Sequence, residues 1–173
     1  MNDIIRNMTE RRSVRAYKPD QVPKDLLDQV LEAGRWAPSG MGRQPVLFIA
    51  VQNKTVRDEL SRMNAAVMGG NNDPFYGAPT VILVLVDAAA GTGVEDGALA
   101  LGNMLNAAYS LGLGCCWIHR AHEMFDSAEG KDLLRKWGVE GNYRGVGCCI
   151  LGYPADSFPA PKPRKEGNVL YIG

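Results

Sequence analysis

The sequence predicts an α+β domain with a mixed central β-sheet flanked by helices. Short apolar runs rich in β-branched residues indicate buried strands, and longer amphipathic runs indicate helices. The two kinds alternate irregularly, without tandem βα units, which favours α+β over a doubly wound fold. The chain has 173 residues, 46% of them hydrophobic, which is enough for about one domain with a sizeable core. We therefore expect a single domain over residues 1–173, with residues 155–173 forming an extended C-terminal tail.

The first half of the chain contains two helix signals and two strand signals. NDIIRNMTERR (2–12) predicts a short helix, and VRAYKPDQV (14–22) predicts an extended link. Pro23 is a favoured first helical residue, and an apolar face follows it up to the sequence WAPSG, where this helix should end. That face consists of Leu26, Leu27, Val30 and Leu31. The runs VLFIAV (46–51) and TVILVLVD (80–87) predict core strands.

The second half begins with a helix that is apolar on nearly all sides. EDGALALGNMLNAAYSLGL (95–113) is interrupted by Gly102 and closes with glycines suited to a helix end. A helix buried all round in so small a protein suggests a subunit interface. GCCWIH (114–119) and GVGCCILGYP (145–154) predict two further strands, with a short helix around AEGKDLLRKW between them.

Charge and hydropathy exclude several classes of protein. Lys plus Arg equals Asp plus Glu at 19 each, so the chain lacks the overall basic field that drives binding to nucleic acid or membranes. The N-terminus is polar, and no window approaches the ~20 apolar residues of a membrane span. These features predict a cytoplasmic protein.

The four cysteines form two adjacent pairs, Cys115-Cys116 and Cys148-Cys149, each within an apolar run. Neighbouring strand residues point to opposite faces, so one pair cannot face a metal as CxxC spacing allows. Buried free thiols are expected, although the sequence leaves a disulfide between the pairs open. His119 and His122 are the only histidines, and two alone make a poor metal site, so no metal is expected.

A cluster of arginines near the N-terminus is a candidate anion site. RRSVR places Arg11, Arg12 and Arg15 around the hydroxyl of Ser13. Planar guanidinium groups and a small hydroxyl are suited to holding a phosphate. The alternative is a solvated helix end, as for most short charge runs.

Two further segments carry ligand-binding potential. The loop APSGMGRQP (37–45) has glycines that permit close approach of a ligand, with Ser39 and Gln44 as hydrogen-bonding groups, or it is only a turn. The tail contains PKPRK, in which Lys162 and Arg164 lie on the same side of an extended chain, or it is simply solvated. The ending NVLYIG is too hydrophobic to remain in water, so we expect it to add a strand to a partner subunit.

Taken in order, these motifs resemble the nitroreductase family of FMN-dependent oxidoreductases in its short form. The resemblance rests on RRSVR, WAPSGMGRQPVLF, GAPTVILV, ALALGNMLNAAYSLGLGCCWI, LGYP and PKPRK, and covers essentially the whole chain. It implies a homodimer with bound FMN that oxidises NADH or NADPH. No GxGxxG motif is present, consistent with a family unlike the doubly wound nucleotide binders.

The resemblance also implies roles for individual residues. Arg11 and Ser13 would bind the FMN phosphate, Arg12 would add a further contact, and Arg15 would lie at the pyrimidine edge of the ring. The remaining residues fall into three segments. The tail residues Lys162 and Arg164 would close the phosphate site, the loop residues Pro38, Ser39, Gly40, Met41 and Gln44 would reach the flavin from the other subunit, and Cys116, Trp117, Ile118 and His119 would run along the isoalloxazine.

One position departs from the better-known long members of the family, which carry Glu-Gly where this chain has His119 and Arg120. A backbone amide that faces the hydride-accepting nitrogen would survive this change, whereas the side-chain roles would not. No side-chain nucleophile is expected, because the flavin carries the chemistry.

The expected activity is transfer of a hydride from NAD(P)H to nitroaromatics, quinones or similar electrophiles by a ping-pong mechanism. Alternatives are a flavin-binding storage or redox-sensing protein without turnover, and a related flavin reductase or dehalogenase. The short chain leaves little room for the helical excursion of the long members, so we expect an open active site with residues 64–79 as a candidate lid.

Overall fold

Four strands form one sheet at the centre of the computed structural model, which describes residues 1–173. The strands are β1 (Val46–Val51), β2 (Thr80–Asp87), β3 (Gly114–Ile118) and β4 (Tyr143–Gly152), in the spatial order β1-β2-β4-β3. Both edge strands, β1 and β3, therefore have one neighbour each.

The α+β class is confirmed, but the pairing within the sheet is not mixed as expected. All three neighbouring strand pairs are antiparallel. The connection after β1 returns the chain to the end of the sheet that it has just left, so that Val51 pairs with Val81. The one parallel contact is an isolated bridge between Ser13 and Cys115.

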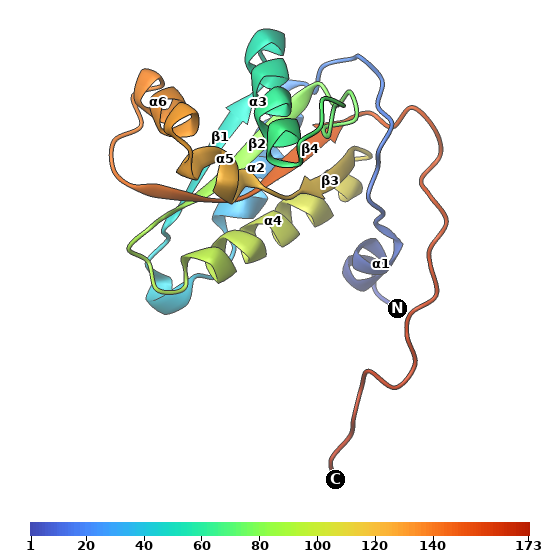
Figure 1. The fold of residues 1–173 in the computed structure, drawn as a ribbon. Helices are drawn as coiled ribbons and strands as arrows, with labels where there is room; N and C mark the ends of the chain where they lie inside the picture. The colour runs from blue at the N-terminus through green and yellow to red at the C-terminus, as the bar shows by residue number, and fades with distance from the viewer.

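Helices cover both faces of the sheet (Figure 1). On one face lie α2 (Lys24–Arg35) and α4 (Gly93–Ser110), and on the other lie α3 (Lys54–Val67), α5 (Ala121–Asp126) and α6 (Ala128–Lys136). Each face has its own core, with Leu60, Phe75 and Phe125 in one and Leu101 and Met104 in the other. Alternate residues of β2 and β4 supply the two cores, because successive strand side chains point to opposite faces.

Most of the expected elements are present, and two helices were missed. The helix after Pro23, the long apolar helix, the short helix near residue 128 and all four strands lie close to their expected ranges. Helices α3 and α5 were not expected. The N-cap of α3 is Asn53, whose side chain accepts a hydrogen bond of 3.1 Å from the amide of Val56.

Helix α4 packs directly on the sheet along one side only. A Cβ at Gly97 would come within 2.7 Å of Val146, so this helix approaches β4 more closely than any residue with a side chain would allow. Elsewhere on its surface this helix exposes half of Leu99 and more than a third of Val94. The helix is therefore not buried all round within one chain.

The two ends of the chain lie outside the layers. Helix α1 (Asp3–Glu10) has no buried residue and exposes Ile4, Ile5 and Met8. The last residues of the tail extend away from the domain (Figure 1), with Leu170, Tyr171 and Ile172 each more than 80% exposed. One chain thus leaves apolar side chains of both ends in water. No helix has the length and apolar character needed to cross a membrane.

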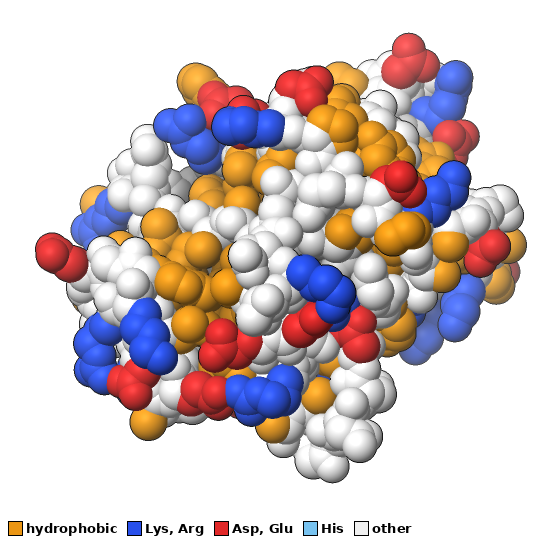
Figure 2. Space-filling model, turned by 90° about the horizontal axis from the view of Figure 1, so that it is seen from above, with side chains coloured by type: hydrophobic (Ala, Val, Ile, Leu, Met, Phe, Trp, Pro, Cys, Tyr) orange, Lys and Arg blue, Asp and Glu red, His pale blue; other side chains and the backbone are white.

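Charges on the face that carries α3 and α6 are locally balanced. Figure 2 shows positive and negative side chains lying next to one another there. Arg62 of α3 pairs with Glu129 of α6, and Lys54 pairs with Asp58. This face therefore has no extended area of one charge sign.

The segment expected as a lid is largely anchored. Its first residues belong to α3, and Asp73 pins the turn that follows. The carboxylate of Asp73 accepts hydrogen bonds from Arg57 Nη2 at 2.5 Å, Ser61 Oγ at 2.6 Å and the amides of Phe75 and Gly77. Arg57 is buried, and its Nε also donates to the carbonyl of Ala78 at 3.0 Å. The Arg57–Asp73 pair thus fixes both ends of the turn.

Replacing Asp73 by Ala should lower the free energy of unfolding by about 3 kcal/mol, because it removes the acceptor of hydrogen bonds from Arg57, Ser61 and two backbone amides. The buried Arg57 would keep only Asp58 as a carboxylate partner. Burial would raise the pKa of Asp73, but hydrogen bonds from Arg57, Ser61, Gly77 and Phe75 lower it below the ordinary 3.8. A lowered folded-state pKa stabilises the protein above the unfolded-state pKa and loses this effect as pH falls through the folded-state value. Urea unfolding should therefore show a full difference between variant and parent at pH 7 and a shrinking one below pH 3.8.

The matched control is Asp28→Ala, which removes an exposed ion pair with Lys24 on α2. Such pairs contribute about 0.3–0.5 kcal/mol. Equal losses for the two variants would refute the anchoring role of Asp73.

Candidate functional site

The N-terminal segment lies along the outer edge of β3. Ser13 forms the bridge with Cys115, and the amide of Val14 donates to the Cys115 carbonyl at 3.0 Å. Because this pairing is parallel, the chain from Arg11 to Arg15 runs in the same direction as β3. We call this region, residues 11–15 with residues 116–120, the β3 edge site.

Arg11 has an unsatisfied donor at one end of the β3 edge site. Its Nη1 is buried and has no hydrogen-bond partner in the chain. Burial raises the pKa of neighbouring Cys115 to about 12, although the charge of Arg11 acts in the opposite direction. The thiol is therefore neutral at pH 7 and does not compensate the guanidinium. A buried donor without a partner is costly, so this position fits an anionic group such as a phosphate.

The two neighbours of Arg11 differ in their surroundings. Arg12 folds back onto the end of α1, where its Nη1 donates to the carbonyls of Thr9 and Arg11 at 2.7 Å each, while its buried Nε has no partner. The hydroxyl of Ser13 makes no hydrogen bond within the chain. Arg12 thus stabilises the helix end and retains one donor for a further contact.

Arg15 lies exposed next to Tyr76, with its guanidinium carbon 6.0 Å from the ring centroid. It forms none of the nine ion pairs of the chain. Its positive charge is therefore available to a ligand along this edge.

The strand residues of the site contribute mainly backbone. Cys116 and Ile118 are buried in the core between the sheet and α3, and Trp117 packs in the other direction. A Cβ at Gly147 would lie 2.5 Å from Trp117 Nε1, so the indole packs closely against β4. The backbone groups of this edge strand thus remain the part that can face a ligand.

The turn after β3 is held in an unusual conformation. Arg120 has φ 76°, in the left-handed region that favours glycine. This agrees with the glycine that long members of the family carry there. The turn is fixed by Asn64 of α3, which is fully buried: its Nδ2 donates to the His119 carbonyl at 2.8 Å, and its Oδ1 accepts from Arg120 Nε at 3.1 Å and Nη2 at 2.9 Å. The side chain of His119 is exposed.

The loop from Pro38 to Gln44 is also locally fixed. Buried Asp96 accepts from the Gly40 amide at 2.8 Å, and the Ser39 hydroxyl accepts from the Gln44 amide at 3.0 Å. Met41 and Gln44 adopt φ 54° and 50°, and Met41 is 86% exposed. Non-glycine residues in this region are strained, and such strain is concentrated at functional sites.

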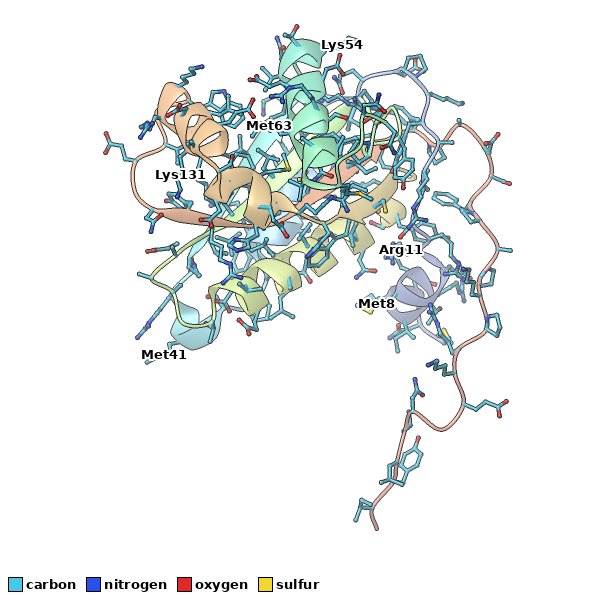
Figure 3. The ribbon with its side chains drawn as sticks, in the orientation of Figure 1. Met8, Arg11, Met41, Lys54, Met63 and Lys131 are labelled. Carbon is cyan, nitrogen blue, oxygen red and sulfur yellow. The ribbon has the colours of Figure 1, made fainter.

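The loop and the arginines lie at opposite ends of α4. Figure 3 shows Arg11 beside the C-terminal end of this helix and Met41 at its N-terminal end. Asp96 contacts the loop, and the Asn106 carbonyl accepts from Asn7 of α1. The ten residues from Asp96 to Asn106 correspond to about 15 Å of helix. One chain therefore does not bring these two sets of expected site residues together.

The basic residues of the tail are likewise apart from the site. Lys162 and Arg164 are exposed and form no ion pair. The tail touches the domain through Phe158, whose ring meets that of Tyr109 edge to face at 5.0 Å. Beyond this contact the tail is free to bind elsewhere.

The family model described as "Nitroreductase family" matches residues 8–153. The chain belongs to the nitroreductase family. The structure resembles, with a TM-score of 0.92, a nitroreductase with bound FMN from Bacteroides fragilis, which is 33% identical over 100% of both chains. A second nitroreductase with bound FMN, from Desulfitobacterium hafniense, gives a TM-score of 0.89 at 26% identity, again over 100% of both chains. The resemblance inferred from the motifs is thereby confirmed.

Two curated relatives of this nitroreductase are named as NAD(P)H-dependent reductases. A Methanothermobacter thermautotrophicus protein, provisionally named NADH dehydrogenase/NAD(P)H nitroreductase, is 30% identical over 90% of the chain and 79% of its own length. FMN reductase [NAD(P)H] of Bacillus subtilis is 27% identical over 95% of the chain and 70% of its own length.

Two residues that position the site of this nitroreductase were missed in the sequence. Asn64 lies within a helix that was not expected, so no signal marked it. Asp96 did carry a signal, because a carboxylate in the first turn of an apolar helix needs a partner once buried. Its partner, the Gly40 amide, lies 56 residues away and could not be identified from the sequence.

Proposed function

We propose that this chain is an FMN-dependent oxidoreductase that takes a hydride from NADH or NADPH and reduces nitroaromatics, quinones or similar electrophiles in a ping-pong cycle. The observation that carries the proposal is the buried, unpartnered Nη1 of Arg11, two residues before the point where Ser13 joins the edge of β3. It is supported by family membership and by the similar structures with bound FMN.

We further propose that the functional unit is a homodimer in which each flavin lies between two subunits. The β3 edge site of one subunit would face the Pro38–Gln44 loop of the other. The separation of these two sets along α4 supports this arrangement. So do the exposed apolar residues of α1 and α4, since soluble proteins rarely leave large apolar patches in water.

The C-terminal tail would cross to the partner. Strand β1 has a free edge, and a cavity of about 580 Å³ lies beside it, lined by Val46, Phe48, Leu31 and Trp36 among others. The exposed apolar end of the tail could add a strand there, with its side chains in the cavity. Lys162 and Arg164 would then reach the phosphate bound by the partner's Arg11.

The residues of the chain bind and tune the cofactor rather than react themselves. When bound, FMN supplies hydride acceptance from the nicotinamide and hydride donation to the acceptor. Arg11, Ser13, Lys162 and Arg164 would hold its phosphate. The unpaired cation of Arg15 would stabilise the negative charge of the reduced form at the pyrimidine edge and thereby raise its reduction potential.

The free state of the cysteines supports a location in a reducing compartment of the cell. All four are free and buried. Reduced thiols fit a reducing compartment, and we place the protein in the cytoplasm.

The proposed activity is tested by anaerobic titration of the FMN-reconstituted protein. We expect a bound flavin spectrum that NADPH or NADH bleaches under argon and that menadione or nitrofurazone then restores. A flavin that binds but is not bleached would identify a store or sensor. Absence of flavin binding would refute the proposal.

A further inference from the structure

Arg120 carries a cation that the fold holds in place without an acidic partner. Its Nε and Nη2 both donate to Asn64 Oδ1, at 3.1 and 2.9 Å. It belongs to none of the nine ion pairs. Asn64 cannot easily move, because it is fully buried and also donates to the His119 carbonyl.

The bonds to Asn64 occupy one edge of the guanidinium only. A guanidinium has five N–H donors in a planar fork. Nη1 of Arg120 makes no hydrogen bond within the chain, and the second N–H of Nη2 is also free. The edge formed by Nη1 and Nη2 thus has the geometry that binds both oxygens of a carboxylate.

No ion pair neutralises this charge. Burial raises the pKa of Cys148 to about 12, although Arg120 lowers it, so this thiol is neutral at pH 7. Two carboxylates of this face already have partners, since Glu129 pairs with Arg62 and Asp73 pairs with Arg57.

Arg120 lies at the opposite end of the β3 edge site from Arg11. The four residues from Cys115 to His119 span about 13 Å of strand. A flavin whose phosphate is bound by Arg11 would therefore extend its ring toward Arg120. This placement rests on the proposed function.

We propose that Arg120 selects electron acceptors that carry a negative charge, in particular aromatic carboxylates. The flat ring of such an acceptor suits the flavin surface, and its carboxylate suits the free edge of the fork. Since Asn64 orients the guanidinium before the ligand arrives, little conformational freedom is lost on binding.

The test uses the oxidised, FMN-reconstituted protein with benzoate and benzyl alcohol as matched probes, and follows the visible absorption of the flavin. We expect the parent to bind benzoate more tightly than benzyl alcohol. Arg120→Gln should weaken benzoate at least tenfold and leave benzyl alcohol unchanged, while Arg120→Lys should retain part of the preference. Arg135→Gln, an exposed arginine on α6, is the control and should behave as the parent.

A second readout is the ratio of kcat/KM for 4-nitrobenzoate and 4-nitrobenzyl alcohol, which should fall at least tenfold in Arg120→Gln. Unchanged benzoate affinity in this variant would overturn the inference while leaving the proposed function intact. A loss of FMN affinity without loss of benzoate affinity would assign the fork to the cofactor and also overturn it. Failure of the parent to bind FMN would instead refute the proposed function.

Discussion

Cutting the chain after Pro154 should abolish tight FMN binding and the dimer together. The removed residues include Lys162 and Arg164, which would bind the phosphate, and the apolar end that would pair with the partner's β1. Equilibrium sedimentation should show a monomer, and added FMN should no longer raise the melting temperature, because a ligand stabilises only the form that binds it.

The double variant Lys162→Ala, Arg164→Ala is the control that separates the two effects. It removes the cations and keeps the apolar residues at the end of the tail. We expect weaker FMN binding with the dimer intact. A truncated protein that stays dimeric and yellow would show that the tail is only a solvated appendage.

Arg11→Ala should weaken FMN binding by about ten- to a hundredfold. The loss corresponds to one charge-assisted hydrogen bond of about 1.5–3 kcal/mol. Flavin fluorescence titration measures it directly. Arg6→Ala is the matched control, since Arg6 lies on α1, of which Arg11 is the C-cap, and pairs only with Asp3 at the exposed surface. Equal affinity of the Arg11→Ala and Arg6→Ala proteins would remove Arg11 from the phosphate site.

The elements of the fold were predictable where local pattern determines them. Short apolar runs identified all four strands, and Pro23 marked the start of α2. Strand direction was not predictable, because it depends on where α3 returns the chain, and α3 itself was missed. The burial of α4 was overestimated, because the periodicity of a sequence does not tell whether an apolar side faces the same chain or a second copy.

For the candidate site, the sequence identified residues but not their mutual positions. The arginine cluster was recognisable in the sequence RRSVR. Only the structure shows that Nη1 of Arg11 is buried without a hydrogen-bond partner. The support that Asn64 gives to Arg120 depends on a contact across 56 residues, for which a single sequence holds no signal. The left-handed backbone of Arg120 agrees with the glycine that the longer family members carry at this position. The contacts of Asn64 that fix the turn could be identified only from the structure.

The composite site is tested most directly by mixing two defective proteins, Arg11→Ala and the double variant Lys162→Ala, Arg164→Ala, and isolating the mixed dimer with two affinity tags. If arginine and tail come from different subunits, one of its two sites has both an intact Arg11 and an intact tail, and the other has neither. The account predicts that the mixed dimer binds one FMN with the affinity of the parent. Two equally weak sites would show that each subunit supplies both groups itself, which would contradict the account.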